Sequence, residues 1–472
     1  METGVLNVSR RNFLTLTGAS ALAAKLGLLD FASSLCADAP KSTTRPRVRA
    51  VFVRPETDRY WMGWPGAAYD PEARQAEYTK ILTAAAKSLG VRFEVNPVPV
   101  HEPESVEDLL AELEQSPPDG LIVTVMNVKS WARVHYLAKN RPDVPMIVFS
   151  PLGTGFAENA RPIRGVPKTF VAATQDAEWL STGMKMLKAI AEMKNARIAI
   201  IAGQAAKDVR LDAIGTTLHY LPLDRWPAEV RKVEESAESR AIADYYAREA
   251  LRVVEPRQAD ILAAAKNYVV ARNIMAAENC QGISVDCFPL VNERRVGCGM
   301  CLAWSRLLDE GIVAACEGDP DAAVSMMLTS LLFDRPGFMQ DPAPNTVNNT
   351  LIGSHCTCAT KLAGFDQPHE PFELRSHAES QTGVALKVVW RPEQEITILK
   401  FRAPATLALA TGRVVGNVAD KDSTGCRTAI EVRLDGADPA DIQGSHQLFV
   451  YGNLDAPLKA FAQLAGLTVA PI

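Results

Sequence analysis

The chain has 472 residues, of which 47% are hydrophobic and 22% are charged, and its formal net charge is −5. This length exceeds one ordinary core and predicts two or three domains of a globular protein. The negative charge argues against nucleic acid as a partner, and after the N-terminal segment no apolar run is long enough to span a membrane.

Residues 1–39 have the pattern of an export signal. Arg10 and Arg11 stand directly ahead of a short apolar stretch, which is typical of a twin-arginine signal peptide. Residues 37–39, Ala-Asp-Ala, supply a cleavage site of small residues. We therefore expect export by the twin-arginine route, with a periplasmic mature protein. An ordinary N-terminal helix that carries two arginines is the alternative.

Residues 40–174 alternate between strand-like and helix-like patterns. Short apolar runs are followed by stretches with apolar residues at helical spacing, and one of these ends at a glycine. Strands that alternate with helices predict a doubly wound parallel sheet. The expected strands are 47–53, 91–100, 119–126 and 144–150, and the expected helices are 71–90, 105–116 and 128–140.

The same alternation resumes in residues 175–345 and gives way to short alternating strands in residues 346–472. We therefore predict an α/β fold of two doubly wound, Rossmann-like α/β domains followed by a β-rich, barrel-like C-terminal domain. In the second domain we expect strands at 196–203, 282–288 and 312–316, and helices within 235–278 and at 301–311. In the third we expect strands at 383–402, 406–418, 427–434 and 467–472, and a helix at 455–466.

Two acidic residues in the second domain lack an obvious structural role. Glu317 directly follows the buried strand 312–316, and Asp341 closes the extended stretch after the next helix. Asp319 is a good N-cap for that helix, so we expect only a capping role for it. In a strand–helix–strand unit, ligands bind beyond the carboxyl ends of the strands, which would bring Glu317 and Asp341 to one edge. A solvated charged loop is the alternative.

Two carboxylates at one edge repel each other unless they are protonated, paired or bridged by a cation. With an imidazole they form a site suited to a hard or borderline divalent ion such as manganese or magnesium. Of the seven histidines, His355 follows soon after Asp341, and His446 lies at the entry to a late strand of the third domain. A single histidine is more often structural than a ligand, so neither is singled out by its context alone.

Three segments carry a resemblance to a known family. They are EGD at 317–319, FMQD at 338–341 and HQLFVYGNLDAPLKAFAQLAGLTV at 446–469. The first two have the spacing, and the third has the gap-free frame, of the L-fucose isomerase family, with a more distant likeness to arabinose isomerase. The resemblance is best over residues 280–365 and 440–470.

The resemblance implies that Glu317, Asp341 and His446 hold a catalytic divalent ion, usually Mn²⁺, and that His355 lines the substrate site. It also implies an aldose–ketose isomerase that acts on a small, fucose- or arabinose-like sugar through an enediol. Glu317 and Asp341 would share the proton transfer as base and acid. The family commonly forms trimers or hexamers, so a homo-oligomer is expected.

Aromatic residues between 58 and 70 are further candidates for the sugar site. Trp61 and Trp64 could stack on a sugar face. Packing of this loop against the first domain is the alternative.

Two other classes of function stay open from the sequence. An exported, non-catalytic carbohydrate-binding protein would have two α/β lobes and no need of a metal. A thiol or iron–sulfur protein would use Cys298, Cys301, Cys356 and Cys358, although we favour buried structural thiols or one disulfide as the explanation of these cysteines.

Overall fold

A computed structural model of the chain describes residues 45–56, 60–61, 68–419 and 425–472. The predicted export signal, its arginines and Trp64 lie outside the described residues. Within the described residues, every helix is too short or too polar to cross a membrane.

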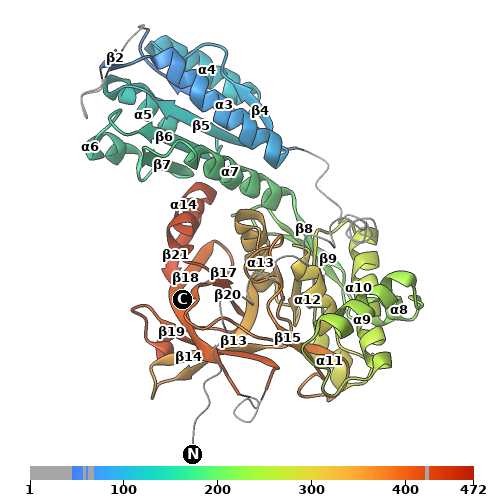
Figure 1. Ribbon diagram of the computed structural model, residues 1–472. Helices are drawn as coiled ribbons and strands as arrows, with labels where there is room; N and C mark the ends of the chain where they lie inside the picture. The colour runs from blue at the N-terminus through green and yellow to red at the C-terminus, as the bar shows by residue number, and fades with distance from the viewer. Residues whose placement is uncertain (1–44, 57–59, 62–67, 420–424) are drawn as a thin grey trace, which may run out of the picture. The chain divides into compact units, whose positions relative to one another are not determined.

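The first part of the chain forms a five-stranded, all-parallel sheet in the order β4-β1-β5-β6-β7 (Figure 1). Its helices cover both faces, because α3 and α7 pack together over one face while α4 and α5 pack together over the other. The strands are β1 (Arg47–Val53), β4 (Arg92–Val95), β5 (Gly120–Val125), β6 (Met146–Pro151) and β7 (Thr169–Thr174), and the short pair β2 (Tyr60–Trp61) and β3 (Ala68–Tyr69) lies apart from them. The helices are α3 (Pro71–Leu89), α4 (Pro103–Gln115), α5 (Trp131–Asn140), α6 (Ala157–Ala160) and α7 (Trp179–Asn195), with 3₁₀ turns η1 (Val128–Ser130) and η2 (Arg161–Ile163).

A second five-stranded sheet has the order β12-β11-β8-β10-β9, and β9 alone runs antiparallel. The hairpin of β9 and β10 was not expected from the sequence, because its strands are short and β9 is exposed along its whole length. The strands are β8 (Arg197–Ile201), β9 (Lys207–Arg210), β10 (Thr217–Leu221), β11 (Gly282–Val285) and β12 (Val313–Cys316). The helices are α8 (Arg225–Val230), α9 (Ala237–Glu249), α10 (Gln258–Ala277), α11 (Cys287–Asn292), α12 (Cys301–Asp309) and α13 (Pro320–Phe333).

The C-terminal part forms a closed, six-stranded antiparallel barrel. Its strand order is β17-β20-β13-β14-β19-β18, and pairing between β17 and β18 closes the ring. The barrel strands are β13 (Phe338–Asn345), β14 (Thr350–His355), β17 (Glu395–Arg402), β18 (Thr406–Asn417), β19 (Thr428–Leu434) and β20 (Gln447–Tyr451). The remaining elements are the hairpin β15 (Phe372–Arg375) and β16 (Ala385–Val388), the turn η3 (Pro439–Asp441), α14 (Asp455–Ala465) and β21 (Thr468–Pro471), which pairs in parallel with β18. The predicted fold class, α/β followed by a β-rich domain, is confirmed.

One topological expectation is wrong. The strand that carries Asp341 does not return to the parallel sheet, because β13 pairs antiparallel with β14 and β20 of the barrel. Asp341 therefore lies inside a barrel strand rather than at the end of a strand–helix–strand unit. The domain boundaries expected near residues 174 and 345 stay predictions.

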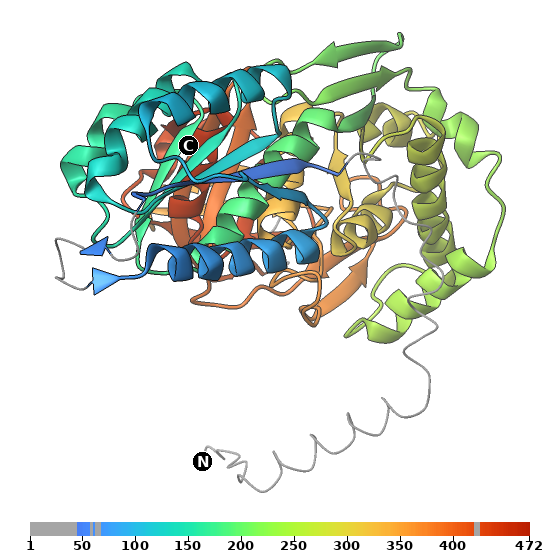
Figure 2. The same cartoon turned by 90° about the horizontal axis from the view of Figure 1, so that it is seen from above.

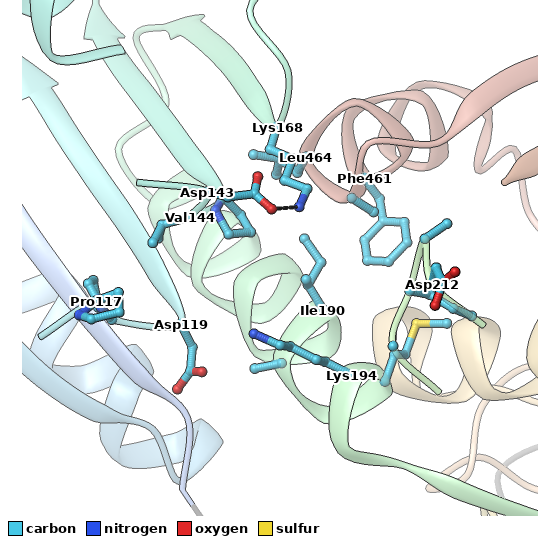
Figure 3. A pocket seen from close by; sticks show the side chains of 18 of the residues that line it. Pro117, Asp119, Asp143, Val144, Lys168, Ile190, Lys194, Asp212, Phe461 and Leu464 are labelled. Atoms are coloured by element: carbon cyan, nitrogen blue, oxygen red, sulfur yellow. Dashed lines mark hydrogen bonds and ion pairs between the residues drawn. The ribbon is translucent and has the colours of Figure 1, made fainter. Parts of the chain in front are cut away.

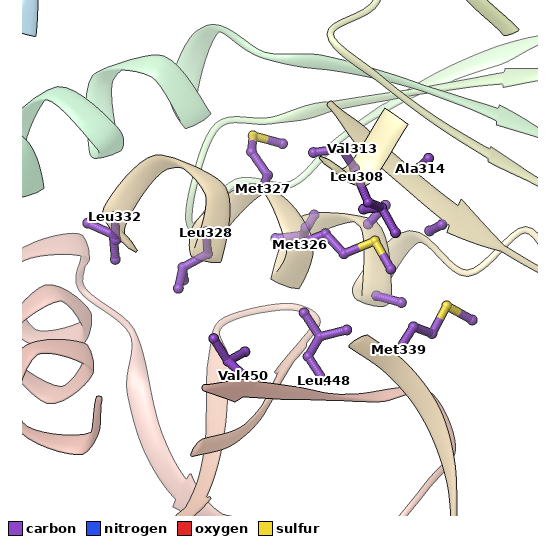
Figure 4. Close-up of a cluster of buried hydrophobic side chains, with 14 of the residues drawn as sticks. Leu308, Val313, Ala314, Met326, Met327, Leu328, Leu332, Met339, Leu448 and Val450 are labelled. Atoms are coloured by element: carbon purple, nitrogen blue, oxygen red, sulfur yellow. The ribbon is translucent and has the colours of Figure 1, made fainter. Parts of the chain in front are cut away.

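Helix α13 is buried on almost all sides between the second sheet and the barrel. Its residues pack against β11 and β12 on one side and against β17 and β20 on the other. In Figure 4, Met326 of α13 and Leu448 of β20 approach each other across this layer. A helix that is apolar all round belongs in a core, which explains why its sequence shows no amphipathic stripe.

We expect Leu448→Ala to destabilise the protein by about 2–5 kcal/mol, because it leaves a cavity in the layer between α13 and the barrel. Leu448 is fully buried, whereas Leu251 is 65% exposed, so Leu251→Ala is a matched control expected to change stability by less than about 0.5 kcal/mol. Urea unfolding of the two variants measures the difference. Equal stability would contradict the role given to this layer.

Candidate metal centre

Four side chains that could ligate a metal ion meet at the junction of the second sheet and the barrel. Glu317, Asp341, His355 and His446 each place a ligand atom within 4.8 Å of the others. The first comes from the edge of the parallel sheet, and the other three come from the barrel. All four were singled out from the sequence.

Glu317 reaches the cluster through a tight turn at the end of β12. Its φ is 59°, and Gly318 follows with a φ of 67°, so two successive residues adopt the left-handed conformation before α13 begins. This conformation is unfavourable for a residue with a side chain and costs on the order of 1–3 kcal/mol. His446 has a φ of 58° directly before β20. Two cluster residues are therefore held in strained backbone, which is characteristic of functional sites.

The strand register of the barrel brings the other three residues together. Gln340 pairs with Gln447, so the same antiparallel register places Asp341 opposite His446. On its other side β13 pairs with β14, where Asp341 is opposite Ser354, the neighbour of His355. Asp341 thus lies opposite an imidazole on one side and one residue away from an imidazole on the other.

The distances within the cluster are those of direct polar contacts. His446 Nε2 lies 3.2 Å from Glu317 Oε2 and 3.5 Å from Asp341 Oδ1. His355 Nε2 lies 3.3 Å from Glu317 Oε1, and the two imidazole rings are 5.8 Å apart. The Nε2 atoms of both histidines and the carboxylate oxygens of Glu317 and Asp341 thus face a common point.

Asp319 does more than cap α13, so the expectation of a capping role alone is wrong. Its Oδ1 accepts a hydrogen bond from the backbone N–H of Ala322 at 2.9 Å, as an N-cap does. Its Oδ2 lies 2.8 Å from His446 Nδ1 and 3.3 Å from Lys400 Nζ. A carboxylate beside Nδ1 keeps the proton on that nitrogen, so the lone pair of Nε2 is left to bind a metal ion. This arrangement is usual for metal-ligating histidines.

The electrostatics of the cluster favour its ionised form. Burial disfavours the charged form of Glu317, but the imidazoles of His355 and His446 outweigh it and lower the pKa of Glu317 to about 2. Burial likewise opposes protonation of His446, but Asp319 and Glu317 outweigh it and raise its pKa to about 9. Without an ion, a protonated His446 thus balances the carboxylates, and a bound cation would take the place of its Nε2 proton.

One buried atom of the cluster has no hydrogen-bond partner among the described residues. His355 is 2% exposed, its Nδ1 contacts the Thr357 hydroxyl at 3.0 Å, and its Nε2 forms no hydrogen bond although it faces Glu317. Its 3.3 Å contact with Glu317 Oε1 is electrostatic rather than an aligned hydrogen bond, and an ion or water bound at this nitrogen would complete its coordination. Two carboxylates and two imidazoles also form a donor set suited to a divalent ion. The four side chains of the cluster are therefore suited to bind a divalent metal ion.

A further carboxylate lies at the same edge of the second sheet and was missed in the sequence. Asp286 follows β11 directly, next to the strand that delivers Glu317, and lies close to Gly318. Burial, with a smaller contribution from Glu317, raises the pKa of Asp286. Its position at the end of a parallel strand was the signal available in the sequence.

The structure does not test the other predicted residues of the sugar site. Trp61 lies on β2, where only the backbone is described, and Trp64 lies outside the described residues, so stacking on a sugar stays a prediction. The four cysteines proposed as one thiol site do not form it: Cys298 and Cys358 each donate to a neighbouring backbone carbonyl instead.

A cavity of about 360 Å³ lies elsewhere in the chain (Figure 3). It is lined by residues that precede β5, β6 and β7, by α7 and by α14, among them Lys168, Ile190 and Phe461. None of the four cluster residues lines it, so the cavity does not mark the candidate metal centre.

Comparison with known proteins gives partial similarity to sugar isomerases. No family model matches the chain. The chain is 25% identical over 180 residues to a sulfoquinovose isomerase of Clostridium sp. (strain MSTE9), a match that covers 36% of this chain and 40% of the relative. It is 30% identical over 139 residues to a sulfoquinovose isomerase of Alkalicoccus urumqiensis, covering 29% of this chain and 28% of the relative. The chain thus aligns with less than half the length of these curated relatives.

We expect Asp319→Ala to be less stable than Asp319→Asn by about 0.5–2 kcal/mol, because asparagine keeps the N-cap of α13 and alanine does not. Both variants lose the same negative charge, so their difference isolates the cap. Urea unfolding of the metal-free proteins measures it. Variants of equal stability would mean that Asp319 is needed for His446 alone.

Proposed function

We propose that the protein is a metal-dependent aldose–ketose isomerase that acts on a small sugar. The observation that carries the proposal is the convergence of Glu317, Asp341, His355 and His446 from two remote parts of the fold. Similarity to proteins named sulfoquinovose isomerase supports the same class of reaction.

In this proposal Glu317, Asp341 and His446 hold the ion, and His355 completes the wall of the site. Manganese suits oxygen and imidazole donors, and magnesium is the alternative. When bound, the ion supplies a Lewis acid that polarises two adjacent oxygens of the sugar. Asp341 is the most open of the four, with its side chain 47% exposed, so we place the sugar on its side of the cluster.

The proton chemistry is assigned to the two carboxylates. Isomerisation through an enediol removes a proton from one carbon and returns a proton to its neighbour, which needs a base and an acid within reach of both. The low pKa of Glu317 keeps its carboxylate ionised, as a base must be, but also makes it a weak base. Asp341 lies across His446 from Glu317 and shares the transfer.

Two observations bear on which sugar is the substrate, and they point to different sugars. The sequence motifs resemble those of fucose and arabinose isomerases, whereas the relatives are named for sulfoquinovose. We therefore propose a small sugar of one of these kinds. Export by the twin-arginine route and assembly into a homo-trimer or homo-hexamer remain part of the proposal.

The alternative is an exported protein that binds a carbohydrate without catalysis. Such a protein has no use for a metal centre in which a buried His355 nitrogen has no hydrogen-bond partner. Metal analysis separates the two: a metal-free protein that binds sugar without converting it would support the alternative.

We expect Glu317→Gln and Asp341→Asn each to lower kcat by at least about 10²-fold, because each removes a proton-transfer group and an ion ligand. The assay is sugar interconversion with added Mn²⁺, on a panel that contains fucose, arabinose and sulfoquinovose. Glu395→Gln is a control, because Glu395 is an exposed carboxylate on the barrel that pairs with Arg413. Full activity in both site variants would end the proposal.

We expect Asp319→Asn to weaken Mn²⁺ binding by about 10–100-fold, because it removes the carboxylate that orients His446. Titration calorimetry on metal-free protein measures the affinity. Asp334→Asn is the matched control at the opposite end of α13, where the side chain pairs with Lys185. If Asp319→Asn binds Mn²⁺ like the control, the orienting role is wrong.

A further inference from the structure

A second group of metal-ligand side chains lies beside the first and has a different chemistry. Cys301, Cys356 and His377 each place a ligand atom within 4.8 Å of the others. The two cysteines are 7% and 3% exposed. Cys426 packs against them, and the Cys356 thiol contacts both Cys301 and Cys426. Three thiols and one imidazole therefore share a largely buried space.

These four residues come from four separate segments of the chain. Cys301 is the first residue of α12, and Cys356 follows the last residue of β14. His377 lies two residues after β15, and Cys426 lies two residues before β19. In the β14–β19 pairing His355 is opposite Thr428, so the same register brings Cys356 opposite Arg427, and Cys426 is the residue next to Arg427.

Hydrogen bonds fix these segments against one another. Arg427, next to Cys426, donates through Nε to the backbone carbonyl of Ser376, next to His377, at 2.8 Å. The backbone N–H of Leu302, next to Cys301, donates to the carbonyl of Val384 at 3.2 Å. The loop that bears His377 is thus tied at one end to Cys426 and at the other to Cys301.

His377 has one nitrogen left for a ligand. Its Nδ1 lies 3.1 Å from the Ser380 hydroxyl, which can accept the Nδ1 proton as an outer partner of a ligating histidine does. The backbone N–H of Ser380, 3.3 Å away, donates to the same Nδ1 atom. When no ion is bound, this hydrogen bond favours the tautomer that carries its proton on Nε2. Binding of an ion at Nε2 therefore requires the tautomer that carries its proton on Nδ1 and donates it to Ser380.

We propose that Cys301, Cys356, Cys426 and His377 bind a zinc ion as a closed tetrahedral site. Three thiolates and one imidazole are a donor set typical of structural zinc and unsuited to manganese or magnesium. In this proposal Cys426, which packs against the other two cysteines, supplies the fourth ligand. The site is distinct from the first centre, which contains two carboxylates and two imidazoles and no thiol.

The two centres are joined by one peptide bond. Cys356 directly follows His355, so an ion held by Cys356 fixes the end of β14 and the direction of the His355 ring. The zinc site thereby positions the His355 ring in the first centre, while its own ligands do not contact the sugar. Its role is structural.

The test is the metal content of full-length protein produced with zinc in the medium and purified under a reducing buffer. We expect about one zinc ion per chain in the wild type, measured by plasma mass spectrometry. Cys356→Ser and His377→Gln should lose it. Cys358→Ser is the matched control, because Cys358 is also buried and lies two residues away, with its thiol donating to the Ala359 carbonyl.

A first-centre variant separates this proposal from the proposed function. Glu317→Gln should keep its zinc whether or not the protein is an isomerase. If Cys356→Ser fails to fold, cobalt-substituted wild type gives the answer, because thiolate ligation produces a sulfur-to-cobalt absorption band and tetrahedral geometry produces intense visible bands. Wild type without zinc or such bands, zinc retained in Cys356→Ser and His377→Gln, or a Cys356–Cys426 disulfide in the exported protein would each overturn the proposal.

Discussion

The position of α13 between the second sheet and the barrel is the constraint on which the candidate metal centre depends. The helix begins at Pro320, three residues after Glu317, and packs along β20, whose first residue follows His446. A carboxylate from a parallel sheet and an imidazole from an antiparallel barrel are thereby held within one contact distance. Because the helix is buried on both sides, neither part can move alone without opening a cavity.

The cluster stays together despite its charge because of hydrogen bonds around its rim. Lys400 donates hydrogen bonds to Asp319 and, at 2.6 Å, to the Ser445 carbonyl. Asp319 in turn accepts a hydrogen bond from His446 Nδ1, so these residues form a hydrogen-bonded chain. This chain orients the imidazole before any ion arrives. Left-handed backbone at Glu317 and His446 adds a cost that the surrounding fold has to offset. Ligands that are oriented in advance are what a binding centre needs.

The two ligand clusters at this end of the barrel contain different types of donor group. Carboxylates and imidazoles gather around Glu317, and thiols gather around Cys356. Thiolate sets favour zinc and exclude manganese and magnesium, while carboxylate and imidazole sets accept manganese, so ligand type contributes to keeping the two ions apart. The adjacent residues His355 and Cys356 face one cluster each, as successive residues of an extended chain do.

Local sequence patterns determined most of the elements and half of the candidate metal centre. Periodicity predicted the alternation of strands and helices, and Glu317 and Asp341 stood out because no local role explained them. His446 entered only through a resemblance in the last segment of the chain. The tertiary structure alone decided that β13 joins the barrel, that Asp319 orients His446, and that Cys301 meets His377 and Cys426. Each of these depends on strand register or on packing between segments remote in sequence, and no local pattern encodes which remote partner a strand selects.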